Sequence, residues 1–119
     1  LPVVDIVYGY AGTNSGVAVN AFVSNGAKGI IHAGVGNGSV HKNTLPSLDK
    51  ARKDGVVVVR SSRVGSGIVA RNGELNDDEH DFVASDSLNP QKAKVLLQLI
   101  MVKNPKATAK EIQDIFYKY

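Results

Sequence analysis

Short apolar runs alternate along the chain with segments whose apolar residues recur at helical spacing. β-branched and aromatic residues dominate positions 3–10 and 56–59, a run centred on two isoleucines lies at 28–33, and a shorter run covers 82–85. Runs of this length, bounded by glycine and polar turns, are typical of buried strands. The run at 56–59 is apolar at every position, as expected of a parallel strand that is covered by helices on both faces.

Four helices are expected between and after these strands. The first ends at Gly26, where a glycine can form a left-handed cap. The second lies within residues 40–54, with Thr44 as its candidate N-cap. The third begins after Asn89 with a proline in its first position, which is a favoured helix start. The fourth begins after Thr108, whose hydroxyl forms a capping box with the glutamate three residues further on.

The order of these elements predicts an α/β fold. We expect a small, open, Rossmann-like sheet of about four parallel strands in a three-layer arrangement with flanking helices, followed by a C-terminal pair of helices. The 119 residues suit one domain. In such a sheet, ligands bind at the carboxyl edge of the strands, where the loops near Gly12, Gly34 and Arg63 are expected to converge. Residues 62–81 are expected to form one long polar loop, and loops of this length are often functional.

Composition narrows the class of function. The formal net charge is +3, but Lys and Arg are dispersed among 11 acidic residues, and the only aromatic residues are three Phe and four Tyr. A nucleic-acid surface usually combines a basic stripe with a stacking platform, so we expect no nucleic-acid partner. The absence of cysteine excludes a disulfide framework and a thiolate metal site. No apolar run approaches the roughly 18 residues of a membrane span, and no signal peptide opens the sequence, so we expect no membrane partner.

The residue types that bind metal ions do not form a recognisable site. His32, His41 and His80 have no metal-ligand spacing. The acidic run at 77–81 lacks the glycine and the spaced carboxylates of a calcium loop. We therefore expect no metal ion, and His32 is expected to face either the core or the ligand crevice.

The most informative motif is the glycine-rich turn at 34–39 (Gly-Val-Gly-Asn-Gly-Ser), which directly follows a predicted strand. Its glycines allow a ligand to approach the backbone closely. The spacing is not that of a dinucleotide fingerprint, because Ser39 stands where the third glycine would be. From the residues alone, the turn is either structural or ligand-binding, and Ser39 is either a helix cap or a ligand group.

Other polar residues admit two interpretations. Arg60 and Arg63 either bind an anion or pair with loop carboxylates, and we favour pairing. Glu74, taken alone, is a solvated loop residue. No Gly-x-Ser-x-Gly elbow occurs, and the serines show no sign of an activating base nearby. The sequence therefore contains no evident nucleophile.

Three motifs together resemble a known family. They are the turn at 34–39, the Arg-Ser-Ser-Arg segment at 60–63 and the Ser-Leu-Asn-Pro-Gln-Lys-Ala segment at 87–93. In this order and spacing they resemble the C-terminal domain of type II bacterial L-asparaginases, and the resemblance covers the whole chain. It implies that residues 1–119 are a single C-terminal asparaginase domain and that the N-terminal catalytic domain is absent from this chain. The family's nucleophilic threonine lies in that other domain, so the resemblance implies no catalytic residue here and an inactive isolated chain.

The resemblance also implies specific roles. In the family, the residue equivalent to Ser39 is Asn or Ser, and it reaches across a subunit interface toward the α-amino end of the substrate. Serine there accompanies better use of glutamine, so some glutaminase activity is implied. Glu74 falls on the family's substrate-binding glutamate, whose carboxylate pairs with the α-ammonium group. The implied whole protein is a periplasmic homotetramer, a dimer of intimate dimers, that hydrolyses L-asparagine to L-aspartate and ammonia without a cofactor.

A second hypothesis is a stand-alone Rossmann-like module that binds a small molecule without catalysis. The two hypotheses differ in one observable feature. A domain taken from a larger enzyme is expected to expose an apolar face where its partner domain or neighbouring subunits pack, whereas a self-sufficient module is not. The sequence leaves open whether the chain is a fragment, a nicked product or one half of a split protein.

Overall fold

The computed structural model of the chain describes residues 1–9, 14–64, 67–73 and 75–119. Four strands form one parallel sheet with the spatial order β1-β2-β3-β4. The strands are β1 (Val4–Tyr8), β2 (Gly29–Gly34), β3 (Val57–Ser62) and β4 (Val83–Ala84). The helices are α1 (Ser15–Ser24), α2 (Leu45–Lys53), α3 (Asp77–His80), α4 (Pro90–Lys103) and α5 (Ala109–Phe116). The predicted α/β fold with a four-stranded parallel sheet and a C-terminal helix pair is confirmed.

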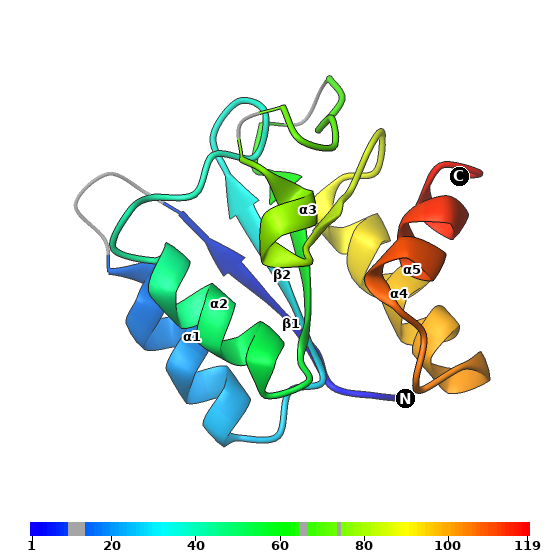
Figure 1. Ribbon diagram of the computed structural model, residues 1–119, viewed down its shortest axis with the longest axis horizontal. Coiled ribbons are helices and arrows are strands. Elements are labelled where there is room, and N and C mark those ends of the chain that lie inside the picture. Colours follow the sequence, from blue (N-terminus) through cyan, green and yellow to red (C-terminus); the bar gives the residue numbers. More distant parts are fainter. Residues whose placement is uncertain (10–13, 65–66, 74) are drawn as a thin grey trace.

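The sheet lies between two helical layers (Figure 1). Helices α1 and α2 cover one face, and α4 packs across β1, β2 and β3 on the other, with α5 beside α4 and β4. Each face has its own apolar core. The core under α1 and α2 includes Val19, Ile30, Leu48, Val58 and Phe82. The core under α4 and α5 includes Ile31, Val59, Leu97, Ile112 and Phe116. Alternate residues of one strand thus serve opposite cores, which explains why these strands are apolar at successive positions.

Strand β3 continues beyond the predicted end at residue 59. Arg60, Ser61 and Ser62 keep the parallel register with β2, in which Arg60 lies beside His32. All three are buried although they are polar. Strand pairing therefore overrides the change in side-chain polarity, and β3 carries polar groups directly to the carboxyl edge of the sheet.

The predicted helix ends are confirmed except for one cap. Gly26 has a φ of 95° after α1. The Asn89 side chain accepts a hydrogen bond from the Lys92 amide, and Thr108 forms the full capping box of α5. Thr44 does occupy the N-cap position of α2, but its side chain makes no capping hydrogen bond. The amide of the first residue of α2 is bonded instead to the carbonyl of His41.

The segment predicted as one long loop contains a short helix, so that prediction is wrong in part. Helix α3 (Asp77–His80) begins after Asn76, whose side chain accepts a hydrogen bond from the Glu79 amide. It ends at Asp81, which adopts the left-handed conformation with a φ of 60°. A four-residue helix is too short to show an apolar period, so its only sequence signal is the capping asparagine.

A glutamine side chain closes the exposed edge of β4. Gln113 Nε2 donates to the carbonyl of Ala84 at 3.0 Å, and Gln113 Oε1 accepts from the Ala84 amide at 2.8 Å. The amide group therefore replaces the neighbouring strand that this edge lacks. Both residues are buried, so the contact fixes α5 against the sheet. Of the helices described, none is both long enough and apolar enough to cross a membrane.

Candidate functional site

A cavity of about 470 Å³ opens at the carboxyl edge of the sheet, where ligands of parallel α/β folds usually bind. The turn after β2 forms much of its wall, and residues that follow β1 and β3 complete it. The lining residues are Gly9, Ser15, His32, Gly34, Val35, Ser39, Val40, His41, Lys42 and Arg63. The predicted convergence of loops is thus observed for Gly34 and Arg63, whereas Gly12 lies outside the described residues.

The glycine turn is shaped by two close approaches. A Cβ atom on Gly34 would lie 3.0 Å from the amide nitrogen and the carbonyl carbon of Ser39, and would overlap its carbonyl oxygen. Gly38 has a φ of 75°, and a Cβ atom there would lie 2.9 Å from Val69 and 3.1 Å from Arg60. Both positions therefore need glycine for lack of space, and Gly38 also needs it for its backbone conformation.

Ser39 lies at the cavity wall and is half-buried. Its amide donates to the carbonyl of Val35 at 3.0 Å, which closes the turn. The N-cap of α2 is Thr44, five residues further along the chain, so Ser39 does not cap this helix. The helix-cap alternative for Ser39 is therefore wrong.

His32 is a buried imidazole at this cavity. Its side chain is 1% exposed, and neither ring nitrogen has a hydrogen-bond partner among the described residues. Burial is the larger cause and the positive charge of nearby Arg60 the smaller one, and together they lower the pKa of His32 to about 4. The ring is consequently neutral near pH 7. His32 faces the crevice rather than the apolar core alone, which settles an alternative that the sequence left open.

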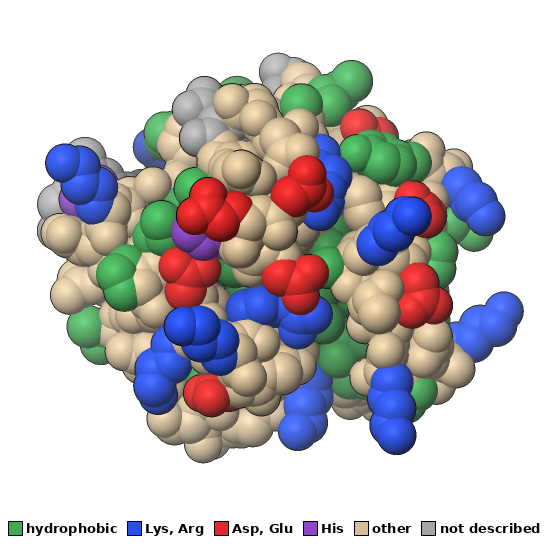
Figure 2. All heavy atoms as spheres, in the orientation of Figure 1, with side chains coloured by type: hydrophobic (Ala, Val, Ile, Leu, Met, Phe, Trp, Pro, Cys, Tyr) green, Lys and Arg blue, Asp and Glu red, His purple; other side chains and the backbone are tan. Residues whose placement is uncertain are grey.

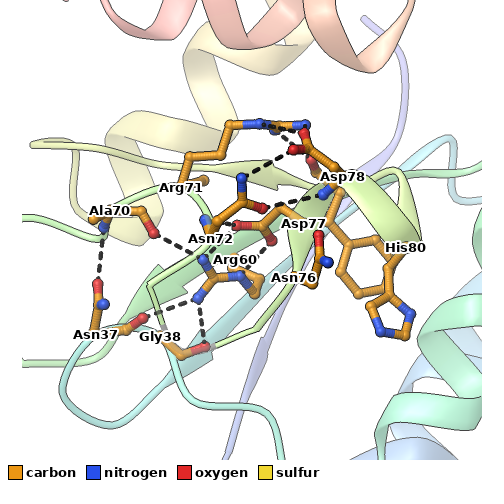
Figure 3. A network of polar contacts seen from close by, with 12 residues as sticks. Asn37, Gly38, Arg60, Ala70, Arg71, Asn72, Asn76, Asp77, Asp78 and His80 are labelled. Atoms are coloured by element: carbon orange, nitrogen blue, oxygen red, sulfur yellow. Dashed lines mark hydrogen bonds and ion pairs between the residues drawn. The ribbon is translucent and has the colours of Figure 1, made fainter.

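Arg60 lies behind the cavity wall and is fully buried. Its guanidinium meets the carboxylate of Asp77 in a two-pronged ion pair, with Nε and Nη2 each 2.6 Å from an oxygen (Figure 3). Nη1 donates to the carbonyls of Asn37 and Gly38, and Nη2 also donates to the carbonyl of Ala70. A guanidinium has five N–H donors, and all five are used here. Arg60 therefore has no donor left for an anionic ligand, and the favoured prediction that it pairs with a loop carboxylate is confirmed.

The acidic run around α3 is occupied by ion pairs. Arg71 pairs with Asp78 at 2.8 Å, Arg52 pairs with Asp81 at 2.9 Å, and His80 contacts Asp49 at 2.7 Å. Hydrogen bonds from Arg71 lower the pKa of Asp78. Figure 2 shows these acidic side chains gathered around α3 and bordered by basic ones. Among the residues that the structure describes, no group of three His, Asp or Glu side chains is placed to hold a metal ion.

Glu74 lies outside the described residues, but the chain on both sides of it is fixed. The Asn72 amide donates to Asp77 Oδ2 at 2.8 Å, and its side-chain amide donates to Asp78 at 3.0 Å. On the earlier side, Val69 forms a two-bond antiparallel bridge with Asp86. The segment is thus tied to α3 and to the connection between β4 and α4.

A larger cavity of about 730 Å³ lies at the opposite edge of the sheet. Its lining includes Lys28 and Val57, which stand at the amino ends of β2 and β3. Two of its charged residues, Arg52 and Asp81, are already paired with each other. The carboxyl-edge cavity is the better candidate because the glycine turn, Ser39 and His32, whose ring has no partner among the described residues, all meet there.

The chemistry available at the carboxyl edge is that of recognition. Its hydroxyl, imidazole, ammonium and guanidinium groups are able to hydrogen-bond a ligand, and the ammonium of Lys42 and the guanidinium of Arg63 carry positive charge. Ser15 and Ser39 line the cavity, but the neutral His32 donates to and accepts from neither of them. An activated serine needs a base within hydrogen-bond reach. The described residues therefore form a binding surface without a nucleophile–base pair.

Comparison with known proteins identifies what this chain resembles. Residues 3–116 match the sequence model described as the glutaminase/asparaginase C-terminal domain. The chain is 48% identical over 120 residues to the glutaminase-asparaginase of Pseudomonas fluorescens biotype A, covering 100% of this chain and 32% of that protein. It is 47% identical over 121 residues to L-asparaginase 2 of Escherichia coli strain K12, covering 100% and 33%.

Two further relatives carry names that differ in cellular location. The chain is 50% identical over 117 residues to the probable periplasmic L-asparaginase of Haemophilus influenzae, covering 96% of this chain and 33% of that protein. The crystal structure of a probable cytoplasmic L-asparaginase from Campylobacter jejuni matches with a TM-score of 0.91 and 46% identity, covering 100% of this chain and 38% of that one. The chain spans about a third of the length of the curated relatives it matches.

Proposed function

Because this chain belongs to the glutaminase/asparaginase C-terminal domain family, we propose that it is the C-terminal domain of an L-asparagine amidohydrolase. The complete protein hydrolyses the side-chain amide of L-asparagine to L-aspartate and ammonia. The N-terminal domain, which would precede this one, supplies the threonine nucleophile. The observation that carries this proposal is the match to the family over residues 3–116, supported by a carboxyl edge that has binding groups but no nucleophile–base pair among its described residues.

The proposal gives Ser39 and Glu74 substrate-binding roles. Ser39 stands at the wall of the carboxyl-edge cavity with its backbone fixed by the turn. From there its hydroxyl hydrogen-bonds the α-amino end of a substrate held by a neighbouring subunit. The Glu74 carboxylate pairs with the α-ammonium group through a charge-assisted hydrogen bond. L-Glutamine is a second substrate, in keeping with the serine at position 39 and with the name of the Pseudomonas relative.

An exposed apolar face on α4 supports a domain that packs against other parts of a larger protein. Val95, Leu99 and Val102 are 55%, 56% and 56% exposed. Their spacing of four and three residues places them on one side of the helix. Gln98 lies within this face and donates a hydrogen bond to the carbonyl of Pro2 at 3.1 Å. The stand-alone binding module does not account for such a face, whereas a domain of a homotetramer does.

The complete enzyme is proposed to be a periplasmic homotetramer built as a dimer of intimate dimers. The name of the Haemophilus relative supports the compartment, and the name of the Campylobacter structure supports the cytoplasm instead. Fractionation of cells that express the complete protein distinguishes the two. Sedimentation velocity of the same protein measures the number of subunits, and a monomer would contradict the proposed assembly.

The test of function is ammonia release from L-asparagine and L-glutamine. The chain is assayed alone, then mixed with the N-terminal part of the Escherichia coli relative, and then fused to that part in place of its own C-terminal third. Activity only in the mixture or the fusion supports the proposal. Activity of the chain alone would mean that it contains a nucleophile and would overturn the assignment of the catalytic half. A folded fusion without activity would favour the binding module, which calorimetric titration with L-asparagine then checks.

A further inference from the structure

Two segments that the proposed function places at the substrate are joined by one buried ion pair. Arg60 donates to the carbonyls of Asn37 and Gly38 at 2.9 and 3.2 Å, in the turn that carries Ser39. The same guanidinium donates to the carbonyl of Ala70 at 3.0 Å, in the segment that precedes Glu74. The turn and the segment are thus bonded to a single rigid, planar group.

Asp77 completes this arrangement from the far side of position 74. Its carboxylate accepts both bonds from Arg60, and its Oδ2 also accepts the backbone amide of Asn72. Arg60 and Asp77 are each 0% exposed in their side chains. Asn72 is therefore tied to Asp77 and, through that carboxylate, to Arg60.

We propose that Arg60 and Asp77 are positioning residues that hold the Ser39 turn and the segment 67–73 in the fixed relation needed to bind one amino-acid substrate. The inference rests on the proposed function. It adds two residues that touch no substrate and act only through the segments that do. A rigid frame of this kind matters because a misplacement of about 1 Å at a binding group can cost on the order of a hundredfold in rate.

A direct contact between the two segments supports the same view. Asn37 Oδ1 accepts a hydrogen bond from the Ala70 amide at 2.8 Å. A Cβ atom placed on Gly73 would overlap the side-chain nitrogen of Asn37, so the two residues lie in close contact directly before position 74. Figure 3 shows Asn37, Ala70 and Asn72 arranged around the Arg60 guanidinium.

Apolar packing places only part of the two segments. Val69 is 3% exposed and lies close to Gly38 of the turn, and Leu75 packs against the core under α1 and α2. Val35 in the turn is 44% exposed, and Ile68 in the segment is 62% exposed. Neither belongs to the two apolar cores of the domain. Polar contacts to Arg60 and Asp77 therefore act beside this apolar packing, and a matched control variant is needed to separate a positioning role from general stability.

The expected kinetic effect is a selective loss of binding. The nucleophile belongs to a different domain in the proposed enzyme. A displaced turn or segment is therefore expected to weaken binding of the α-amino end of the substrate more than it slows the chemical step. Asp77→Asn and Asn37→Ala are therefore expected to raise KM for L-asparagine by about tenfold or more, with a smaller change in kcat. Asn37→Ala breaks one bond between the segments and leaves the buried ion pair intact, so it keeps the test valid if Asp77→Asn does not fold.

Arg52→Gln is the matched control. It breaks another Arg–Asp pair next to α3, the 2.9 Å contact of Arg52 with Asp81, which has no bond to the turn. It is expected to lower the melting temperature and leave KM unchanged. Kinetics are measured on the active fusion enzyme. Amide hydrogen exchange of Ser39 and Ala70 is measured by NMR on this chain, because the Ser39 amide closes the turn and the Ala70 amide joins the segment to Asn37.

The outcomes separate this inference from the proposed function. A raised KM in Asp77→Asn or Asn37→Ala, together with faster exchange at both amides, supports the positioning role. An unchanged KM in every one of these two variants that folds, despite faster exchange at Ala70, would overturn it, as would an equal rise of KM in Arg52→Gln. If the unaltered fusion is inactive, the proposed function fails, but the exchange data still test whether Arg60 and Asp77 link the Ser39 turn to the segment that contains Ala70. Faster exchange at Ala70 without faster exchange at Ser39 would then refute this link.

Discussion

Gly34→Ala tests whether the glycine turn is shaped by a close approach of its own backbone. Gly34 is the last residue of β2, and its carbonyl accepts the Arg63 amide at 2.8 Å. The added methyl group would lie 3.0 Å from two backbone atoms of Ser39 and would overlap the carbonyl oxygen, whereas ordinary contacts begin at 3.4 Å. Because backbone atoms cannot rotate away as a side chain can, the turn has to shift by roughly 1 Å.

The size of the effect follows from that shift. Overpacking of this kind costs about 1–3 kcal/mol of folding stability. If Ser39 binds substrate, moving it by roughly 1 Å lowers kcat/KM for L-asparagine by up to about a hundredfold. The two effects are measured separately, the first by urea unfolding of this chain and the second by ammonia release from the fusion enzyme.

Gly36→Asn is the matched control in the same turn. Gly36 has a φ of 53°, and nothing lies within 4 Å of the position of a Cβ atom there. Asparagine tolerates this left-handed conformation, so the control is expected to change stability by less than about 1 kcal/mol. Equal stability and equal activity of Gly34→Ala and Gly36→Asn would refute the argument from close approach.

Four further predictions concern single residues. The folded pKa of His32, about 4, lies below the value of 6.5 for an unfolded histidine, so the unfolded chain takes up the proton first as the pH falls. The contribution of neutral His32 to the free energy of unfolding is therefore fully present above pH 6.5 and is lost as the pH falls to about 4. Chemical unfolding across this range should show that His32→Gln loses about 3 kcal/mol less stability than the unaltered chain. Equal losses in the two proteins would exclude His32 as the cause. Gln113→Ala removes the side-chain partners of both backbone groups of Ala84 and is expected to cost about 2–4 kcal/mol of stability in urea unfolding. Gln113→Glu keeps the acceptor oxygen, so its stability is expected to lie between those of the unaltered chain and Gln113→Ala. An unchanged stability of Gln113→Ala would mean that water replaces the amide. Glu74→Ala is expected to raise KM for L-asparagine at least tenfold because the α-ammonium group loses its charge partner, and unchanged kinetics would remove Glu74 from the site. Ser39→Asn adds bulk at the cavity wall and is expected to lower glutamine turnover relative to asparagine; an unchanged or higher ratio would contradict the role of Ser39.

Local chemistry explains the parts of the fold that the sequence predicted. The caps at Asn89 and Thr108 are each formed within three residues of the chain, so the spacing of the residues is sufficient to identify them. The same holds for Gly26, whose positive φ needs no distant partner. Thr44 marks the limit of this reasoning, since the residue type was right for a cap but its hydroxyl makes no capping bond.

The site depended on contacts that spacing cannot predict. Arg60 and Asp77 are 17 residues apart, and Gln113 and Ala84 are 29 apart. Helix α5 packs beside β4, which brings Gln113 to Ala84, and the long Arg60 side chain of β3 reaches Asp77, the first residue of α3. Nothing local distinguishes Asp77 from the exposed Asp78 beside it, although one carboxylate is fully buried and the other is 68% exposed. A general preference of Arg60 for loop carboxylates was predictable, but the choice of partner was not.

The buried pair also explains why this edge can be polar and still be rigid. A buried charge that loses its partner is costly, so each member of the Arg60–Asp77 pair excludes arrangements in which the other is unpaired. Exposed pairs such as Arg71–Asp78 impose no such penalty, because water replaces either partner. The buried and the exposed ion pairs therefore differ in how strongly they fix the arrangement of the backbone segments around them. The surface pairs add little to the placement of the segment 67–73, whereas the buried pair favours the arrangement in which this segment and the turn carrying Ser39 meet at one guanidinium.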